Sequence, residues 1–200
     1  MKPEREYKES ELIATYTTDE NGSFTTDYFP CGDGWNLREI EASEGYLVNP
    51  IISSLDVLPS RYTQEFNSET AGVIEDVKMA SISIIKHTDD GSTQIETPEE
   101  GAIFVVYLKS AGSFDAAADT ERDYLECDMD GFAMSKALPY GVYTVHQMSG
   151  WDGRELMKDF DVFNSENNGS YKYLINNACF ESYIKITKVD CEYLMVERSG

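Results

Sequence analysis

Apolar and polar residues alternate at every second position in many short stretches of this chain. The clearest stretch begins at a turn over residues 139–141, after which Tyr143, Val145 and Gln147 lie on one predicted face and the residues between them on the other. A period of two is typical of a half-buried strand. Gln147 stands on the apolar face, where a polar side chain needs a hydrogen-bonding partner.

Similar stretches, separated by turn-forming residues, run along the rest of the sequence. Residues 102–108 are the most apolar and predict a central strand, and residues 81–86 and 171–177 predict two more. Residues 113–121 predict either a short helix or a polar excursion. Many short strands at regular spacing are typical of an all-β sandwich.

Two turn dipeptides also predict hairpins. Asn21-Gly22 separates two short runs within residues 15–27, and Asp130-Gly131 separates two within residues 124–135. Asn-Gly and Asp-Gly tolerate the positive φ that tight turns require. We therefore expect the two runs in each pair to form an antiparallel hairpin.

The pattern repeats along the chain. Trp35-x-Leu37-x-Glu39 corresponds to Tyr143-x-Val145-x-Gln147, and Ile82-x-Ile84-x-Lys86 recurs as Ile184-x-Ile186-x-Lys188. Both spacings are about one hundred residues, the size of one β-sandwich domain. The repeat predicts a partial sandwich over residues 1–78 that lacks its first strand, a complete one over 79–180, and the first strand of a truncated third repeat over 181–200. An unpaired edge in the partial sandwich favours pairing with another chain.

Composition narrows the possible partners. The net charge of −21 over 200 residues excludes nucleic acid and anionic membrane surfaces, which need clustered Lys and Arg. We expect no membrane span, because the chain has no run of about 20 apolar residues. The four cysteines have no metal-ligand spacing, and their pairing stays open. Residues 1–10 are charged throughout and do not form a secretory signal.

Other residues that could take part in metal binding or catalysis have simpler interpretations. His87 and His146 lie on no ligand spacing and are expected at the surface. The Asp-rich turn at 128–131 lacks the downstream Glu of a calcium loop. Trp35 is expected in the core at the position of Tyr143, and Trp151 lies in a loop. We therefore expect no metal and no cofactor.

Several motifs in their order and spacing resemble the collagen-adhesin B-type repeat, also called the SpaA-like prealbumin-like domain, of Gram-positive surface proteins and pilins. The resemblance covers residues 81–177 fully and 17–77 partly. It is carried by Lys86-x-x-Asp89, Gly101-Ala102-x-Phe104-x-Val106-Tyr107, Asp130-Gly131, Leu138-Pro139-Tyr140-Gly141-x-Tyr143 and Asn177.

The resemblance implies immunoglobulin-like (prealbumin-like) β-sandwich repeats, one complete and one partial. It also implies a structural stalk or spacer on the bacterial surface, anchored to the cell wall, with neighbouring repeats of a longer chain as partners and no enzymatic activity on an external substrate. Three alternatives stay open. The chain is an adhesin module that binds a host matrix protein or glycan through its loops, an accessory domain of an enzyme, or a gene fragment without function.

In the family, a Lys on the first strand attacks an Asn on the last strand to form an isopeptide bond, and a buried Glu assists proton transfer. The resemblance places Lys86 and Asn177 at the reacting positions. Gln147 replaces the Glu, and a carboxamide cannot donate a proton at neutral pH. Glu39 holds the Glu position in the partial domain, which has no Lys strand and carries Glu75 or Asp76 at the closing position.

Three interpretations of Lys86 follow. Lys86 forms the cross-link, or it joins Gln147 and Asn177 in a buried polar cluster without a covalent bond, or it extends to solvent from the end of a strand. The cross-link requires burial, because only a deprotonated amine is nucleophilic.

Overall fold

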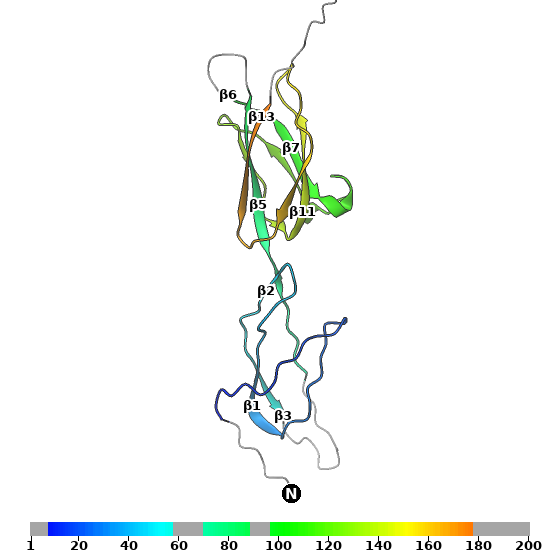
Figure 1. The fold of residues 1–200 in the computed structure, drawn as a ribbon, viewed down its shortest axis with the longest axis vertical. Coiled ribbons are helices and arrows are strands. Elements are labelled where there is room, and N and C mark those ends of the chain that lie inside the picture. The colour runs from blue at the N-terminus through cyan, green and yellow to red at the C-terminus, as the bar shows by residue number, and fades with distance from the viewer. Residues whose placement is uncertain (1–7, 58–69, 89–96, 178–200) are drawn as a thin grey trace, which may run out of the picture. The chain divides into compact units, whose positions relative to one another are not determined.

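The structure, a computed structural model, describes residues 8–57, 70–88 and 97–177 (Figure 1). Strands dominate these residues and confirm the predicted all-β class. The chain divides into two compact units, the first from residues 1–38 and 50–73 and the second from residues 39–49 and 74–200. Residues 39–49 and 74–78, which the repeat pattern assigns to the first domain, thus pack with the second unit. The strand expected over residues 181–200 lies outside the described residues.

The first unit contains one antiparallel ladder within its described residues. Strand β1 (Gly32–Leu37) pairs with β3 (Ser53–Val57), with Trp35 opposite Leu55. Trp35 is half-buried and packs on the Phe29 ring, with 5.4 Å between the ring centroids.

The predicted turn after Asp19 forms, but the hairpin around it does not. The Asp19 N–H donates to the Ser23 carbonyl at 2.8 Å, while the flanking residues are not strands. Tyr16 and Phe24 stack at 5.3 Å across the turn instead. The flanking runs bury too little apolar surface to hold a ladder in place.

In the second unit, strand β5 (Met79–Thr88) is the centre of a five-stranded sheet. It pairs in parallel with β13 (Ser170–Asn177), and antiparallel with β10 (Leu138–Pro139), β9 (Phe132–Met134) and β6 (Thr97–Pro98). β5 and β13 are thus neighbours, as the Lys–Asn pair implied by the family resemblance requires.

A second sheet has four antiparallel strands in the order β12 (Phe160–Asn164), β11 (Gly141–Ser149), β7 (Ile103–Leu108) and β8 (Arg122–Glu126). A separate short ladder of the same unit joins β2 (Tyr46–Leu47) to β4 (Asp76–Val77). The two larger sheets supply the layers of a sandwich (Figure 1).

The predicted hairpin around Asp130-Gly131 is wrong in its pairing. β8 pairs with β7, whereas β9 pairs with β5 in the other sheet. The Asp128 carboxylate accepts the N–H groups of Asp130 and Phe132 at 2.9 Å, which fixes a turn that carries the chain from one sheet to the other. β8 buries its apolar residues from one sheet and β9 from the other, so neither strand has to pair with the other to bury them.

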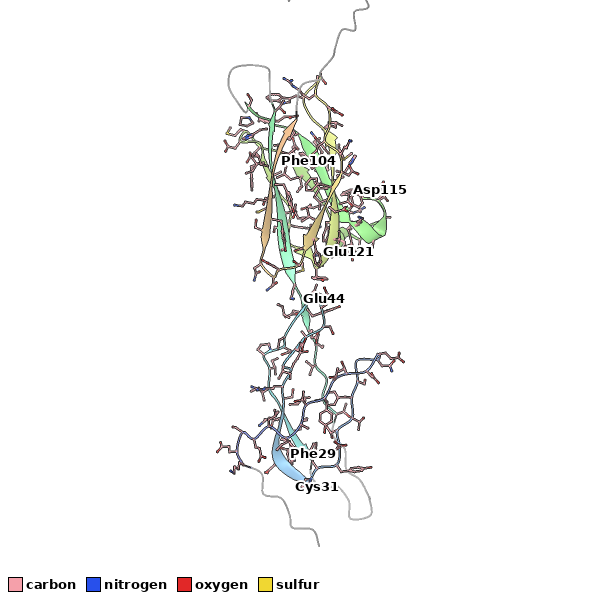
Figure 2. The ribbon with its side chains drawn as sticks, viewed as in Figure 1. Phe29, Cys31, Glu44, Phe104, Asp115 and Glu121 are labelled. Atoms are coloured by element: carbon pink, nitrogen blue, oxygen red, sulfur yellow. The ribbon has the colours of Figure 1, made fainter. Side chains whose placement is uncertain are left out.

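The core lies between these two sheets, and Phe104 is one of its fully buried side chains (Figure 2). On β11, Tyr143, Val145 and Gln147 are buried and His146 is exposed, as the period of two predicts. The Tyr143 hydroxyl donates to the Pro139 carbonyl at 2.9 Å, which ties the strand to the turn before it.

Residues 109–121 form the polar excursion, with the short 3-10 turns η1 (Lys109–Ala111) and η2 (Asp119–Glu121) in place of a helix. Asp115 and Glu121 lie on it (Figure 2). Arg122 holds this segment, donating to the Phe114 carbonyl at 2.9 Å and to Asp119 at 2.6 Å.

Candidate functional site

Lys86 is buried near the end of β5. It continues the inward-facing row of Ile82 and Ile84, and none of its surface is exposed. Its N–H donates to the Gly131 carbonyl at 2.7 Å, and its carbonyl accepts the Glu99 N–H at 3.0 Å. The interpretation of Lys86 as a lysine that extends to solvent is therefore wrong.

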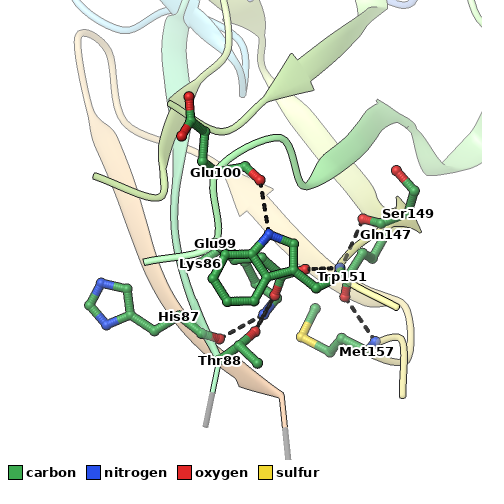
Figure 3. A network of polar contacts seen from close by, with 9 residues as sticks. All are labelled: Lys86, His87, Thr88, Glu99, Glu100, Gln147, Ser149, Trp151 and Met157. Atoms are coloured by element: carbon green, nitrogen blue, oxygen red, sulfur yellow. Dashed lines mark hydrogen bonds and ion pairs between the residues drawn. The ribbon is translucent and has the colours of Figure 1, made fainter. Parts of the chain in front are cut away.

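The ammonium of Lys86 forms an ion pair with Glu99, which lies just before β7. Nζ is 2.5 Å from Oε2, and both side chains are fully buried. Nζ also donates to the His87 carbonyl at 2.6 Å and to the Thr88 hydroxyl at 2.8 Å (Figure 3). These contacts replace the water that the charge loses on burial.

Glu99 is also bound on its other side. Its Oε1 accepts the backbone N–H of Trp151 at 2.5 Å, and its Oε2 accepts the Thr88 hydroxyl. The indole Nε1 of Trp151 donates to the Glu100 carbonyl at 3.2 Å (Figure 3). The loop that carries Trp151 therefore shields the ion pair from solvent on one side.

Burial and pairing act on both ionisable groups. Desolvation lowers the pKa of Lys86, although the hydrogen bond to Glu99 opposes it. Desolvation raises the pKa of Glu99, but the donors Lys86, Thr88 and the Trp151 N–H together bring it below its ordinary value. At neutral pH the site holds an ion pair whose amine loses its proton more readily than a lysine in water.

Gln147 faces the same interior from β11 and is 1% exposed. Its Oε1 accepts the Met157 N–H at 3.0 Å, and its Nε2 donates to the Ser149 carbonyl at 3.3 Å (Figure 3). A Cβ atom on Gly150 would lie 2.9 Å from this Nε2 and would overlap Glu99 Oε1. The absence of a side chain at Gly150 thus makes room for both groups.

Asn177 lies on β13, where its backbone pairs in register with Thr88, while Ile175 pairs with Lys86. Its side chain lies outside the described residues, so its role as the reacting group stays a prediction. The buried cluster expected from Lys86, Gln147 and Asn177 includes the first two, together with Glu99.

Glu39, at the family's Glu position in the partial domain, contacts a carboxyl group instead of a lysine. It accepts the Asn49 N–H at 2.5 Å and shares a hydrogen bond with Glu75, which lowers the pKa of Glu39 and raises that of Glu75. Of the two closing-position alternatives, Glu75 is thus the one in contact with Glu39.

Sequence reasoning missed Glu99. Lys86 and Gln147 both stood on apolar faces, and two buried polar groups of this kind require a further partner. Nothing in the run of Glu99-Glu100 distinguishes the buried carboxylate from its neighbour, so the partner was not identifiable from spacing alone.

Two further chemical groups are an exposed histidine and a buried thiol close to the Lys86–Glu99 pair. His146 is exposed and its Nδ1 lies 2.6 Å from Asp159 Oδ1. Burial raises the pKa of the Cys127 thiol to about 11, so it stays protonated at neutral pH. Among the described residues, no group of three or more His, Cys, Asp and Glu side chains is placed to hold a metal ion. Within those same ranges, no helix has the length and apolar character needed to cross a membrane.

No protein-family model and no curated protein matches this chain. Among solved structures, the Bacillus anthracis TIE protein aligns with a TM-score of 0.61 and 21% identity, over 81% of this chain and 28% of that one. GBS52, the minor pilin of Streptococcus agalactiae, aligns over 57% of this chain and 51% of its own, with 18% identity and a TM-score of 0.43. The shaft pilin SpaA from Lactobacillus rhamnosus GG aligns over 53% and 52%, with 21% identity and a TM-score of 0.40.

Over 81% of its length the chain shares the fold of the TIE protein, in keeping with the predicted all-β class. The likeness to the TIE protein carries this statement and concerns the fold alone. The chain spans 28% of the TIE protein and about half of GBS52 and SpaA.

Proposed function

We propose that this chain is a structural stalk or spacer module of a Gram-positive cell-surface protein, pilin-like or adhesin-like, that bears tension and catalyses no reaction on external substrates. One observation carries the proposal. The first and last strands of the five-stranded sheet, β5 and β13, pair in parallel over eight residues, from Ser81 opposite Ser170 to Thr88 opposite Asn177.

Parallel pairing decides how this unit responds to stretching. Tension along the chain reaches the five-stranded sheet at the start of β5 and leaves it at the end of β13, and these two points lie at opposite ends of the ladder. The force therefore acts along the strands and loads all of the inter-strand hydrogen bonds together. Strands pulled apart from one shared end would instead release their hydrogen bonds one after another, at lower force.

An isopeptide bond from Lys86 belongs to the same proposal, and Asn177 is the acyl group that the family resemblance implies for it. Burial lowers the pKa of the Lys86 amine, and Glu99 supplies the carboxyl group that Gln147 lacks. The backbone of Asn177 lies on the neighbouring strand, two positions beyond Ile175, the partner of Lys86. A covalent bond there would hold β5 to β13 when the hydrogen bonds break.

Single-molecule stretching tests the mechanical role. The full chain is held by its two ends in one experiment, and by residues 76 and 166 in the other. Asp76 and Glu166 are exposed and precede β5 and β13, so the second attachment peels the strands apart from one shared end. We expect the second unit to resist several-fold more force when it is held by the chain ends.

The double variant Lys86→Met with Glu99→Gln is the matched control, because it removes both charges and cannot form the bond. It should keep the directional difference and lose any part of the resistance that is covalent. Equal and low rupture forces in both directions would contradict a load-bearing role.

A further inference from the structure

Three groups that amide formation requires meet in the described part of the second unit. An amine, Lys86 Nζ, lies 2.5 Å from a carboxyl group, Glu99 Oε2. A carboxamide, that of Gln147, lies near the second oxygen of that carboxyl group, since a Cβ on Gly150 would contact both Glu99 Oε1 and Gln147 Nε2. All three side chains are at most 1% exposed, so water competes little for the acyl group.

The carboxamide of Gln147 is held as an acceptor for nucleophilic attack. The Met157 N–H donates to its Oε1 at 3.0 Å, where negative charge develops when an amine adds to the carbonyl carbon. The Ser149 carbonyl accepts from Nε2 at 3.3 Å and fixes which end of the side chain faces that donor. A backbone donor at the oxygen and a carboxyl group near the nitrogen favour expulsion of the nitrogen.

The distance between the sheets suits the reach of the two side chains. Lys86 lies on β5 of one sheet and Gln147 on β11 of the other. Packed sheets are roughly 10 Å apart. An extended lysine reaches roughly 6 Å from Cα to Nζ and a glutamine roughly 4 Å from Cα to Cδ, from bonds of about 1.5 Å. An amide bond between them can therefore span the core.

We propose that Lys86 forms an isopeptide bond with Gln147, which joins β5 to β11 across the two sheets. This inference rests on the proposed cross-linking chemistry but assigns a different acyl group from Asn177. Glu99 accepts one proton from the Lys86 ammonium, and Nζ then attacks Cδ of Gln147. Glu99 relays a second proton from the attacking nitrogen to Nε2, the Cδ–Nε2 bond breaks, and ammonia leaves. The product is an amide, and Glu99 ends protonated.

Mass spectrometry of the intact, full-length chain tests the proposal. We expect a mass about 17 Da below that of the sequence, from the loss of one ammonia. Proteolysis and tandem spectra should then show the peptide with Lys86 joined to the peptide with Gln147. Unmodified mass would overturn the proposal, and so would a loss of about 18 Da located at Lys86 and Glu99, which would mark a bond to the carboxyl group itself.

Two variants separate this inference from the proposed function. Asn177→Ala should keep the loss of about 17 Da, and Gln147→Met should abolish it. A cross-link mapped from Lys86 to Asn177 would overturn the assignment to Gln147, yet leave the load-bearing proposal in place. The mapped peptides of the unmutated chain decide the matter even if Gln147→Met does not fold.

Discussion

The two compact units of this chain share a sequence pattern but differ in packing. In the second unit, two sheets enclose a core in which Phe104, Tyr143 and Val145 are fully buried. In the described residues of the first unit, no side chain reaches that degree of burial, and Tyr28 and Ile51 are 85% and 67% exposed. Alternation thus specifies a strand, but a core requires a second layer against which the apolar face can pack.

The largest loss of stability in one unit without a change in the other should come from breaking the ion pair of the second unit. In a Gln147→Met background, where the cross-link to Gln147 cannot form and the ion pair is kept, Lys86→Met leaves Glu99 buried without its cation, which we expect to lower the free energy of unfolding by about 3–5 kcal/mol. The double variant Lys86→Met with Glu99→Gln should regain much of this stability. Denaturant unfolding, monitored by Trp151 fluorescence in a Trp35→Phe background, measures the free energy of unfolding of the second unit in each variant.

The signal of Trp35 in a Trp151→Phe background reports the first unit and should be unchanged by Lys86→Met. Equal stability of the single and double variants would show that the Glu99 carboxylate is not held as a buried charge.

Large-to-small substitutions compare how much a buried apolar side chain stabilises each of the two units. Phe104→Ala should cost about 3–5 kcal/mol, because it opens a cavity in a closed core. Leu37→Ala removes a half-buried side chain of β1 and should cost less than about 1 kcal/mol. The same two fluorescence signals report each effect. A large cost for Leu37→Ala would mean that the first unit also has a closed core.

Two glycines with the same backbone conformation provide a matched pair. Gly131 has φ +69° and Gly22 has φ +70°, so alanine is strained at both, by about 1–2 kcal/mol. At Gly131 the added Cβ would also overlap the Lys86 carbonyl, while at Gly22 it would meet no atom within 4 Å. Gly131→Ala should therefore destabilise its unit clearly more than Gly22→Ala destabilises the other unit. Chemical denaturation measures both effects. Equal costs would mean that the turn at Gly131 moves freely away from β5.

The smallest expected effect is the pH dependence that Glu99 gives to the second unit. The folded pKa of Glu99 lies below its ordinary value of about 4.3, so its contribution to stability is present above that pH and is lost as the pH falls through the folded pKa. Unfolding curves of the Gln147→Met variant, in which the cross-link to Gln147 cannot form, are compared across this acidic range with those of Gln147→Met combined with Glu99→Gln. A pH profile that Glu99→Gln leaves unchanged would contradict the assignment.

The alternation of apolar and polar residues predicted many of the strands of the second unit, but not which strands pair with each other. The buried row of β11 followed from the period of two, and the adjacency of β5 and β13 followed from the family resemblance. The separation of β8 from β9 did not, because a turn such as Asp128–Gly131 has the same local geometry whether its strands pair with each other or with different sheets. The candidate site was predicted in part for a similar reason. Lys86 and Gln147 stand out as polar residues on apolar faces, while Glu99 is buried only because the loop of Trp151 folds over it.

The direction of β13 also determines what a copy of this unit adds to a polypeptide. Because β13 runs in the same direction as β5, the end of β13 lies about one strand length from the start of β5, roughly 30 Å for the ten residues of β5. Duplication of such a unit within a gene would lengthen the encoded protein in steps of about this size, so that the number of copies sets how far a terminal domain extends.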